Sequence, residues 1–280
     1  MILANTRIVV ANRGCSVMDL ELNFLGVNVA DFETSFRFYT EVLGIEARHS
    51  KPDWAYLETT GMTFELFGIE SSELSAFQRA MLPTPDRSWG RRQTIRPSFQ
   101  IAELENTVSD LRRKGVEFVG DIERTTWGER IEFIATEGFR WTLAHAPSYP
   151  FGSSMRKPHL GWVQIKAHDL AGHQSFYTGV MGLRPDEGDE GQFVLRQRSG
   201  QPLLFLEPGG QQLPAIQSRK QSPHFISFET DNIERATAYM KTHNVPIIQD
   251  VTHEDWGGID IYIKDVDGNP VQVVQYVTAT

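Results

Sequence analysis

The sequence has 280 residues, 40% of them hydrophobic and 22% charged, which is enough for one large or two ordinary globular domains. Its formal net charge of −9 argues against nucleic acid or an anionic membrane as the main partner, because both require a basic surface. The single cysteine, Cys15, excludes an intrachain disulfide, and no apolar run approaches the roughly 18 residues of a membrane helix. We therefore expect a cytoplasmic protein.

The first repeated unit begins after an N-terminal extension, residues 1–19, which lacks the long apolar region of a secretory signal. Its first strand ends at Asp31, whose carboxylate can accept hydrogen bonds from the first N–H groups of a helix. The pair Phe38-Tyr39 then falls on the helix face that is turned to a sheet. Gly44 ends this helix, and strands follow. Whether residues 1–17 belong to the folded protein stays open.

The same pattern returns in the second half of the chain. Asp169 ends an apolar strand, and Phe176-Tyr177 follows it at the spacing that separates Phe38-Tyr39 from Asp31. Weaker copies start at Arg96 and at His224. Because an internal repeat fixes the architecture, the sequence predicts an α+β fold made of four βαβββ units.

The segment 147–157 is rich in Pro, Gly and Ser and is the predicted linker. It separates a first domain of two units at 20–146 from a second domain of two units at 158–278. Insertions at 83–90 and 209–223 are long for a compact fold and are candidates to cover a cavity.

Several phrases of this repeat resemble the vicinal oxygen chelate (VOC) superfamily of glyoxalases, bleomycin-resistance proteins and extradiol dioxygenases. They are Val29-Ala30-Asp31, Phe38-Tyr39, Val42-Leu43-Gly44 and Asp265 through Gly268-Asn269. The resemblance covers residues 20–277 and implies paired βαβββ modules that form two half-open curved sheets, or cups. It also implies a divalent metal in a cup, held by His, Gln or Glu from the first and last strands of each unit.

The residues that align with those metal ligands are mostly unsuited to the task. Counting seven residues back from each helix cap gives the first-strand positions, which are Phe24, Arg96, Trp162 and His224. The last-strand positions are Glu65, Thr142, Leu204 and Gln272. A Phe ring has no donor atom for a metal, and an Arg guanidinium is always protonated. We therefore expect no cofactor, and a divalent metal is disfavoured.

Two pairings of these residues are predicted. In the first half, Arg96 pairs with Glu65 and so places a fixed cation where the family keeps a metal; alternatively, Glu65 points to solvent. In the second half, His224 contacts a ligand or transfers a proton, since its ordinary pKa lies near neutrality, and Gln272 orients it. The alternative is that His224 is an ordinary exposed or hydrogen-bonded strand residue.

Tryptophans form a further group of candidates. Trp127, Trp162 and Trp256 are predicted to contact a ligand, because indoles offer flat apolar area and one N–H donor. Trp141 is predicted to close the rim of a cup.

Two functions are compatible with this pattern. The first is metal-independent binding of a small aromatic or conjugated molecule, as in bleomycin-resistance relatives. The second is a VOC-type enzyme (dioxygenase, lyase or epimerase) with an atypical or metal-free site that uses His224 and Glu65. The expected partner is a small molecule, and the units can pair within one chain or across a homodimer.

Overall fold

The computed structural model describes residues 20–59, 62–69, 93–147, 157–186, 193–197, 202–213, 216 and 218–276. The extension 1–19 with Cys15, the insertion 83–90 and most of the predicted linker lie outside these residues. Within the described part of the chain, no helix is long and apolar enough to cross a membrane.

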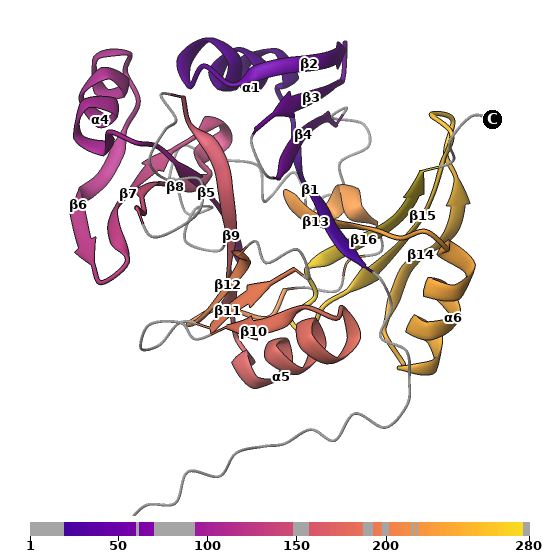
Figure 1. Ribbon diagram of the computed structural model, residues 1–280. Coiled ribbons are helices and arrows are strands. Elements are labelled where there is room, and N and C mark those ends of the chain that lie inside the picture. The colour runs from indigo at the N-terminus through magenta and orange to yellow at the C-terminus, as the bar shows by residue number, and fades with distance from the viewer. Residues whose placement is uncertain are drawn as a thin grey trace, which may run out of the picture.

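Each unit has the predicted order of strand, helix and three strands (Figure 1). The first contains β1 (Glu21–Val29), α1 (Phe32–Arg37), η1 (Phe38–Val42), β2 (Glu46–Lys51), β3 (Trp54–Glu58) and β4 (Thr63–Gly68). The second contains β5 (Ile95–Gln100), α4 (Leu104–Arg113), β6 (Phe118–Thr125), β7 (Gly128–Ile134), η2 (Thr136–Gly138) and β8 (Arg140–His145). The third contains β9 (His159–Ala167), α5 (Leu170–Ser175), η3 (Phe176–Val180), β10 (Arg184–Asp186), β11 (Phe193–Arg196) and β12 (Pro202–Pro208). The fourth contains η4 (Arg219–Gln221), β13 (His224–Glu229), α6 (Ile233–Thr242), β14 (Ile247–His253), β15 (Gly258–Lys264) and β16 (Pro270–Tyr276).

The predicted helix signals of the two strong copies are confirmed. Asp31 accepts a hydrogen bond from the N–H of Thr34 at 3.0 Å, and Asp169 accepts one from the N–H of Gly172 at 2.9 Å. Gly44 and Gly182 end their helices with φ of 76° and 74°, the left-handed conformation that favours glycine.

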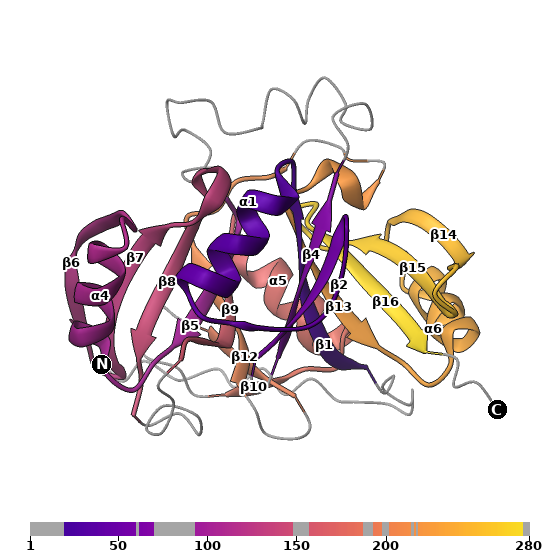
Figure 2. The same ribbon diagram turned by 90° about the horizontal axis from the view of Figure 1, so that it is seen from above.

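The units combine across the chain to form the sheets. The first and fourth units build sheet A, in the order β14-β15-β16-β13-β1-β4-β3-β2. The second and third build sheet B, in the order β10-β11-β12-β9-β5-β8-β7-β6. Figures 1 and 2 show the indigo β1 beside the orange β13, although these strands come from opposite ends of the chain. Each sheet therefore takes one unit from each predicted domain, and the predicted site residues must be regrouped by sheet.

One face of each sheet packs against helices to form a common core. Tyr39 and Tyr177 are fully buried there, which confirms that the Phe-Tyr pairs are core residues. Trp141 is fully buried as well, stacked against Tyr39 at 4.9 Å and against Phe99 at 5.2 Å between ring centroids. The prediction that Trp141 closes a rim is wrong, because its ring lies on the helix side of β8.

Carboxylates in two corresponding turns connect units of different sheets. Glu137 accepts hydrogen bonds from the N–H groups of Ala30 and Asp31, at 2.6 and 2.9 Å, and so joins the second unit to the first. Asp267 accepts one from the N–H of His168 at 2.6 Å and joins the fourth unit to the third. The predicted turn at Asp265–Asn269 thus also holds the two sheets together.

Candidate functional site

The face of each sheet that points away from the helices, which we call the cup face, carries most of the predicted positions. In sheet A, Gly26 pairs with Glu65 on one side and with Phe225 on the other. A Cβ added to Gly26 would lie 2.1 Å from the Phe225 ring, so that ring covers the centre of the sheet. Since side chains alternate along a strand, Phe24 shares this face.

His224 does not lie on the cup face. Asn232, rather than Asp231, caps α6 by accepting a hydrogen bond from the N–H of Arg235 at 2.8 Å. Counting seven residues back from the true cap gives Phe225. A shift of one residue turns a strand side chain to the other face.

The surroundings of His224 agree with this placement. Its ring packs between the sheets, 4.8 Å from Phe139 and 6.3 Å from Trp141. Burial lowers the pKa of His224 to about 3, so the ring is neutral at physiological pH. Gln272 donates to Asp260 at 2.6 Å and does not orient His224.

The last-strand position of the third unit also shifts by one residue. Leu204 pairs with Val163 and belongs to the core, whereas Phe205 pairs with Gln164 on the cup face. Regrouped by sheet, the positions in sheet A are Phe24, Glu65, Phe225 and Gln272. Those in sheet B are Arg96, Thr142, Trp162 and Phe205.

The cup face of sheet A carries four packed rings, which we call the aromatic cluster: Phe24, Phe67, Phe225 and Tyr262. Phe24 and Phe225 meet edge to face, with centroids 5.9 Å apart and planes at 79°. Phe225 and Tyr262 are 5.8 Å apart at 71°. The rings come from β1, β4, β13 and β15; those of Phe24, Phe225 and Tyr262 are buried, and Phe67 is partly buried against them.

Arg219, in η4, lies over this cluster. Its guanidinium is 4.6 Å from the centroid of Phe67, 5.3 Å from Phe225 and 5.8 Å from Tyr262. Sequence analysis missed this residue, because no motif marks it. Arg219 lies inside the insertion 209–223, which the sequence predicts as a cover for a cavity. That position was the one feature of the sequence that pointed to it.

Two buried carboxyl groups lie on the same face. Glu65 accepts a hydrogen bond from the indole N–H of Trp54 at 3.0 Å, and burial raises its pKa to about 7. Burial also raises the pKa of Asp260 to about 6. The prediction that Glu65 pairs with Arg96 is wrong, since the two residues lie in different sheets and Arg96 pairs with Glu132.

Among the residues that the structure describes, three polar atoms on this face are buried without a hydrogen-bond partner. They are the Ser227 hydroxyl oxygen, Oε1 of Gln272 and Oδ1 of Asp260. Ser227 and Gln272 are neighbours in the pairing of β13 with β16, and Gln272 bonds Asp260 through its amide nitrogen. A row of unpartnered polar atoms therefore borders the aromatic cluster.

The cup face of sheet B is dominated by ion pairs. Glu132 contacts Arg96 at 2.6 Å and Arg140 at 3.3 Å, so one carboxylate bridges two guanidinium groups. Arg130 approaches Glu207 at 3.6 Å. The guanidinium groups and carboxylates of this face therefore form ion pairs with one another.

The candidate tryptophans do not converge on one site. Trp127 and Trp162 pack edge to face in sheet B with centroids 5.5 Å apart, and Phe205 lies 5.1 Å from Trp162. Trp256 is 51% exposed on the hairpin between β14 and β15, and its ring lies 5.7 Å from that of Tyr276 in sheet A.

Neither set of aligned residues fits the metal that the resemblance implies. In sheet A, Phe24 and Phe225 offer no donor atom, and Gln272 turns its amide N–H to Asp260. In sheet B, Arg96 is a cation and Trp162 an indole. Over the described ranges of the chain, no group of three His, Cys, Asp or Glu residues is placed to hold a metal ion.

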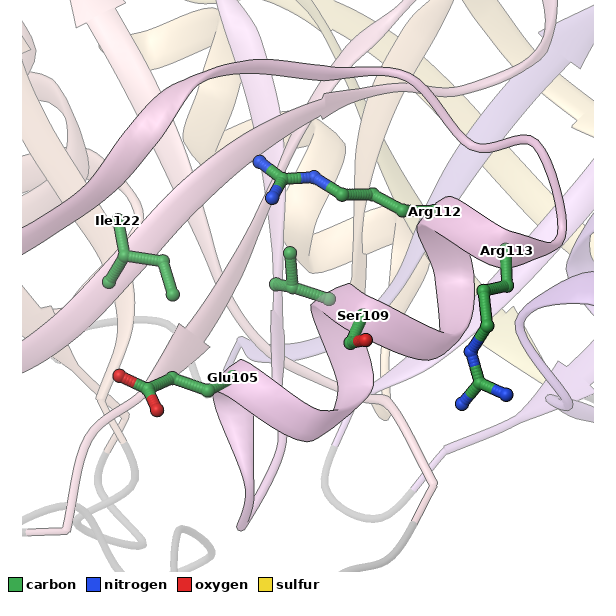
Figure 3. Close-up of a pocket in the computed structure, with 6 residues that line it drawn as sticks. Glu105, Ser109, Arg112, Arg113 and Ile122 are labelled. Atoms are coloured by element: carbon green, nitrogen blue, oxygen red, sulfur yellow. The ribbon is translucent and has the colours of Figure 1, made fainter.

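A hollow of about 510 Å³ lies on the outer surface beside α4, and Figure 3 shows Glu105, Ser109, Arg112, Arg113 and Ile122 around it. None of the predicted site residues lines it. Arg112 covers the ring of Phe118 at 5.4 Å. This hollow lies on an exposed helix face, since Glu105, Ser109, Arg112 and Arg113 are all exposed.

The comparison with known proteins identifies the family. The model of the Glyoxalase/Bleomycin resistance protein/Dioxygenase superfamily matches residues 21–143 and 159–273. No curated protein matches the chain in sequence.

Solved structures share the fold at low sequence identity. Glyoxalase I from Zea mays is 13% identical, with 91% of this chain and 92% of that chain covered and a TM-score of 0.65. A putative dioxygenase from Bacillus subtilis is 10% identical, with 93% and 86% covered and a TM-score of 0.62. Because both family-model matches together span most of the chain, it belongs to the glyoxalase/bleomycin resistance protein/dioxygenase superfamily.

Proposed function

We propose that the protein binds a small, flat aromatic or conjugated molecule on the cup face of sheet A, without a metal. The observation that carries this proposal is the aromatic cluster bordered by unpartnered polar atoms. Rings supply flat apolar area, and a few polar groups fix the orientation of a ligand.

The unpartnered atoms support a bound molecule rather than a closed core. Leaving a buried hydrogen-bonding group without a partner costs about 1–3 kcal/mol, so most such groups in proteins find one. The Ser227 hydroxyl, Oε1 of Gln272 and Oδ1 of Asp260 can each bond a polar substituent of a ligand.

Sheet B is the weaker candidate. Its cup face holds aromatic surface at Trp127 and Trp162, but its charged groups already pair with one another. A ligand there would have to compete with the bridge from Glu132 to Arg96 and Arg140.

A metal-free enzyme is the second candidate, and one observation favours it. Because the pKa of Glu65 is raised to about 7, this carboxyl exchanges a proton near neutral pH and suits general acid–base catalysis. The placement of His224 gives no support to its predicted catalytic role. Turnover of a bound ligand that is lost in Glu65→Gln would establish this candidate in place of simple binding.

Isothermal titration of chelator-treated protein with naphthalene derivatives tests the binding site. Phe225→Leu should weaken binding roughly tenfold or more, because it removes ring area from the cluster. Trp162→Leu changes the corresponding position of sheet B and should leave the affinity unchanged. The opposite pattern would transfer the site to sheet B.

Metal analysis of protein purified without chelators tests the second part of the proposal. We expect no stoichiometric transition metal. Binding that disappears on chelation and returns with one added metal would contradict metal independence.

A further inference from the structure

Arg219 is held in place by the strand beneath it. The side-chain amide of Asn28 donates hydrogen bonds to the carbonyl oxygens of Arg219, at 3.0 Å, and of Ser222, at 2.7 Å. The backbone N–H of Asn28 donates to the carbonyl of Pro223 at 2.8 Å. Asn28 is 4% exposed, so a buried residue of β1 fixes the turn that carries Arg219.

In the described part of the chain, the guanidinium forms no ion pair with a carboxylate. Within the described ranges, no carboxylate oxygen lies within 4.0 Å of it. Its polar contact is a long one of 3.5 Å from Nη1 to Oδ1 of Asn28. The guanidinium groups on the cup face of sheet B differ, since Arg96, Arg130 and Arg140 each contact a carboxylate.

The two nearby acids do not cancel this charge. Arg219 influences both Glu65 and Asp260 electrostatically but forms an ion pair with neither. Burial outweighs its influence and raises both pKa values. Near pH 6, Glu65 is mostly protonated and Asp260 is partly protonated, so these two acids offset only part of the charge of Arg219.

A guanidinium that lies against aromatic rings keeps the N–H donors along its edge available. Those donors match the two oxygens of a carboxylate, and the pair is stronger than a hydrogen bond between neutral groups. The rings of Phe67, Phe225 and Tyr262 lie beneath the same group, so an apolar ring joined to an acid group would satisfy both.

We propose that Arg219 determines the specificity of the cup face of sheet A and selects planar aromatic molecules that carry a carboxylate. This inference rests on the proposed function and names the ligand class. An ammonium substituent would be repelled, and a neutral ligand would leave the guanidinium without an anion.

Titration with two matched probes, 1-naphthoate and 1-naphthalenemethanol, tests the inference at pH 6. The protein should bind the carboxylate roughly ten- to a hundredfold more tightly than the alcohol, the usual range for a charge-assisted pair. Arg219→Gln should remove this preference and leave the affinity for the alcohol within about twofold. Arg219→Lys should restore part of it, because an ammonium keeps the charge but loses the two-pronged geometry.

Arg124→Gln is the matched control, since Arg124 is exposed and pairs with Glu129 in sheet B. It should bind both probes as the unaltered protein does. Thermal unfolding of each variant, followed by circular dichroism, confirms that the compared proteins are folded.

The outcomes separate the two proposals. If the protein binds both probes equally and Arg219→Gln changes neither affinity, the role of Arg219 is overturned while the aromatic site stands. If neither probe binds, both proposals are overturned. Loss of carboxylate binding in Arg219→Gln, with retained alcohol binding, supports both.

Discussion

Sheets A and B are each built from two βαβββ units whose strands follow the same order, yet the charged groups on their cup faces are arranged differently. In sheet B, Glu132 bridges Arg96 and Arg140, so the charges hold one another. In sheet A, Arg219 lies on rings and Glu65 accepts a hydrogen bond from Trp54. The same scaffold thus pairs the charges of one face internally, whereas the other face carries the features on which the proposed ligand site rests.

The stability of the two faces should therefore respond differently to removing one carboxylate. Glu132→Gln removes the ion pair between Glu132 and the buried Arg96 and should lower the free energy of unfolding by up to about 4 kcal/mol. Glu65→Gln breaks no ion pair and should cost little. Urea denaturation at pH 7 measures both. Equal losses would show that the faces do not differ in this respect.

The pH dependence of the free energy of unfolding should show the raised pKa of Glu65. Its pKa is raised from 4.5 to about 7, so the folded state holds a proton that the unfolded chain releases between these values. Stability is therefore highest below pH 4.5 and declines until pH 7, by about 3 kcal/mol for this group. Asp260 and Glu137 act in the same direction, because burial raises their pKa values too.

Unfolding free energies at pH 5 and pH 8 isolate the contribution of Glu65. Glu65→Gln should reduce the difference between these pH values relative to the unaltered protein. An unchanged difference would mean that Glu65 ionises normally in the folded state.

The cup face of sheet A should tolerate no added side chain at Gly26. Gly26→Ala places a Cβ against the Phe225 ring and should destabilise the protein by about 1–3 kcal/mol through overpacking. It should also weaken naphthoate binding by displacing that ring. The corresponding position of sheet B is Ser98, where Ser98→Ala serves as the control. Thermal unfolding and titration of both variants make the comparison.

The smallest effect concerns ligand binding near neutrality. Glu65 loses its proton as the pH rises through 7, which adds a negative charge close to the bound carboxylate. Naphthoate binding should weaken roughly three- to tenfold between pH 6 and pH 8. Asp260, whose pKa is raised to about 6, loses its remaining protons over the same interval and adds to the decline. Tyr262 and Tyr276 face the same region but stay neutral, since the pKa values of both are raised.

Titrations of Glu65→Gln identify the source of this change. The variant should show a smaller decline in naphthoate binding over that interval, because only Asp260 still gains a negative charge there. A decline as large as that of the unaltered protein would contradict the role of Glu65.

The sequence predicted the units because their signals are local. Asp31, Tyr39 and Gly44 cap, pack and end one helix within a few turns, and family membership confirms the resemblance. Which units share a sheet is decided by strand pairing between distant segments, which a local pattern does not encode. The domain boundaries, the homodimer and the cytoplasmic location stay predictions.

The sequence placed part of the predicted residues on the correct sheet face. Phe24, Glu65, Gln272, Arg96 and Trp162 lie on cup faces, as their strand positions indicate. His224 was misplaced because α6 is capped one residue later than Asp231, and a one-residue error reverses a strand face. Arg219 lies in a turn that packs back onto the distant strand β1, and neither its spacing in the sequence nor its residue type predicts this placement.

The pairing of the first unit with the fourth has a consequence for how the chain folds. Asn23 donates a hydrogen bond to the hydroxyl of Tyr276, 253 positions later, whereas the units of sheet B follow one another directly. During synthesis, sheet B can form as soon as the third unit has emerged. The edge of β1 that pairs with β13 stays unpaired until the fourth unit has been made. Refolding should therefore show sheet B forming before sheet A. In a chain whose folding stops before the fourth unit pairs, the unpaired edge of β1 is the expected site of aggregation.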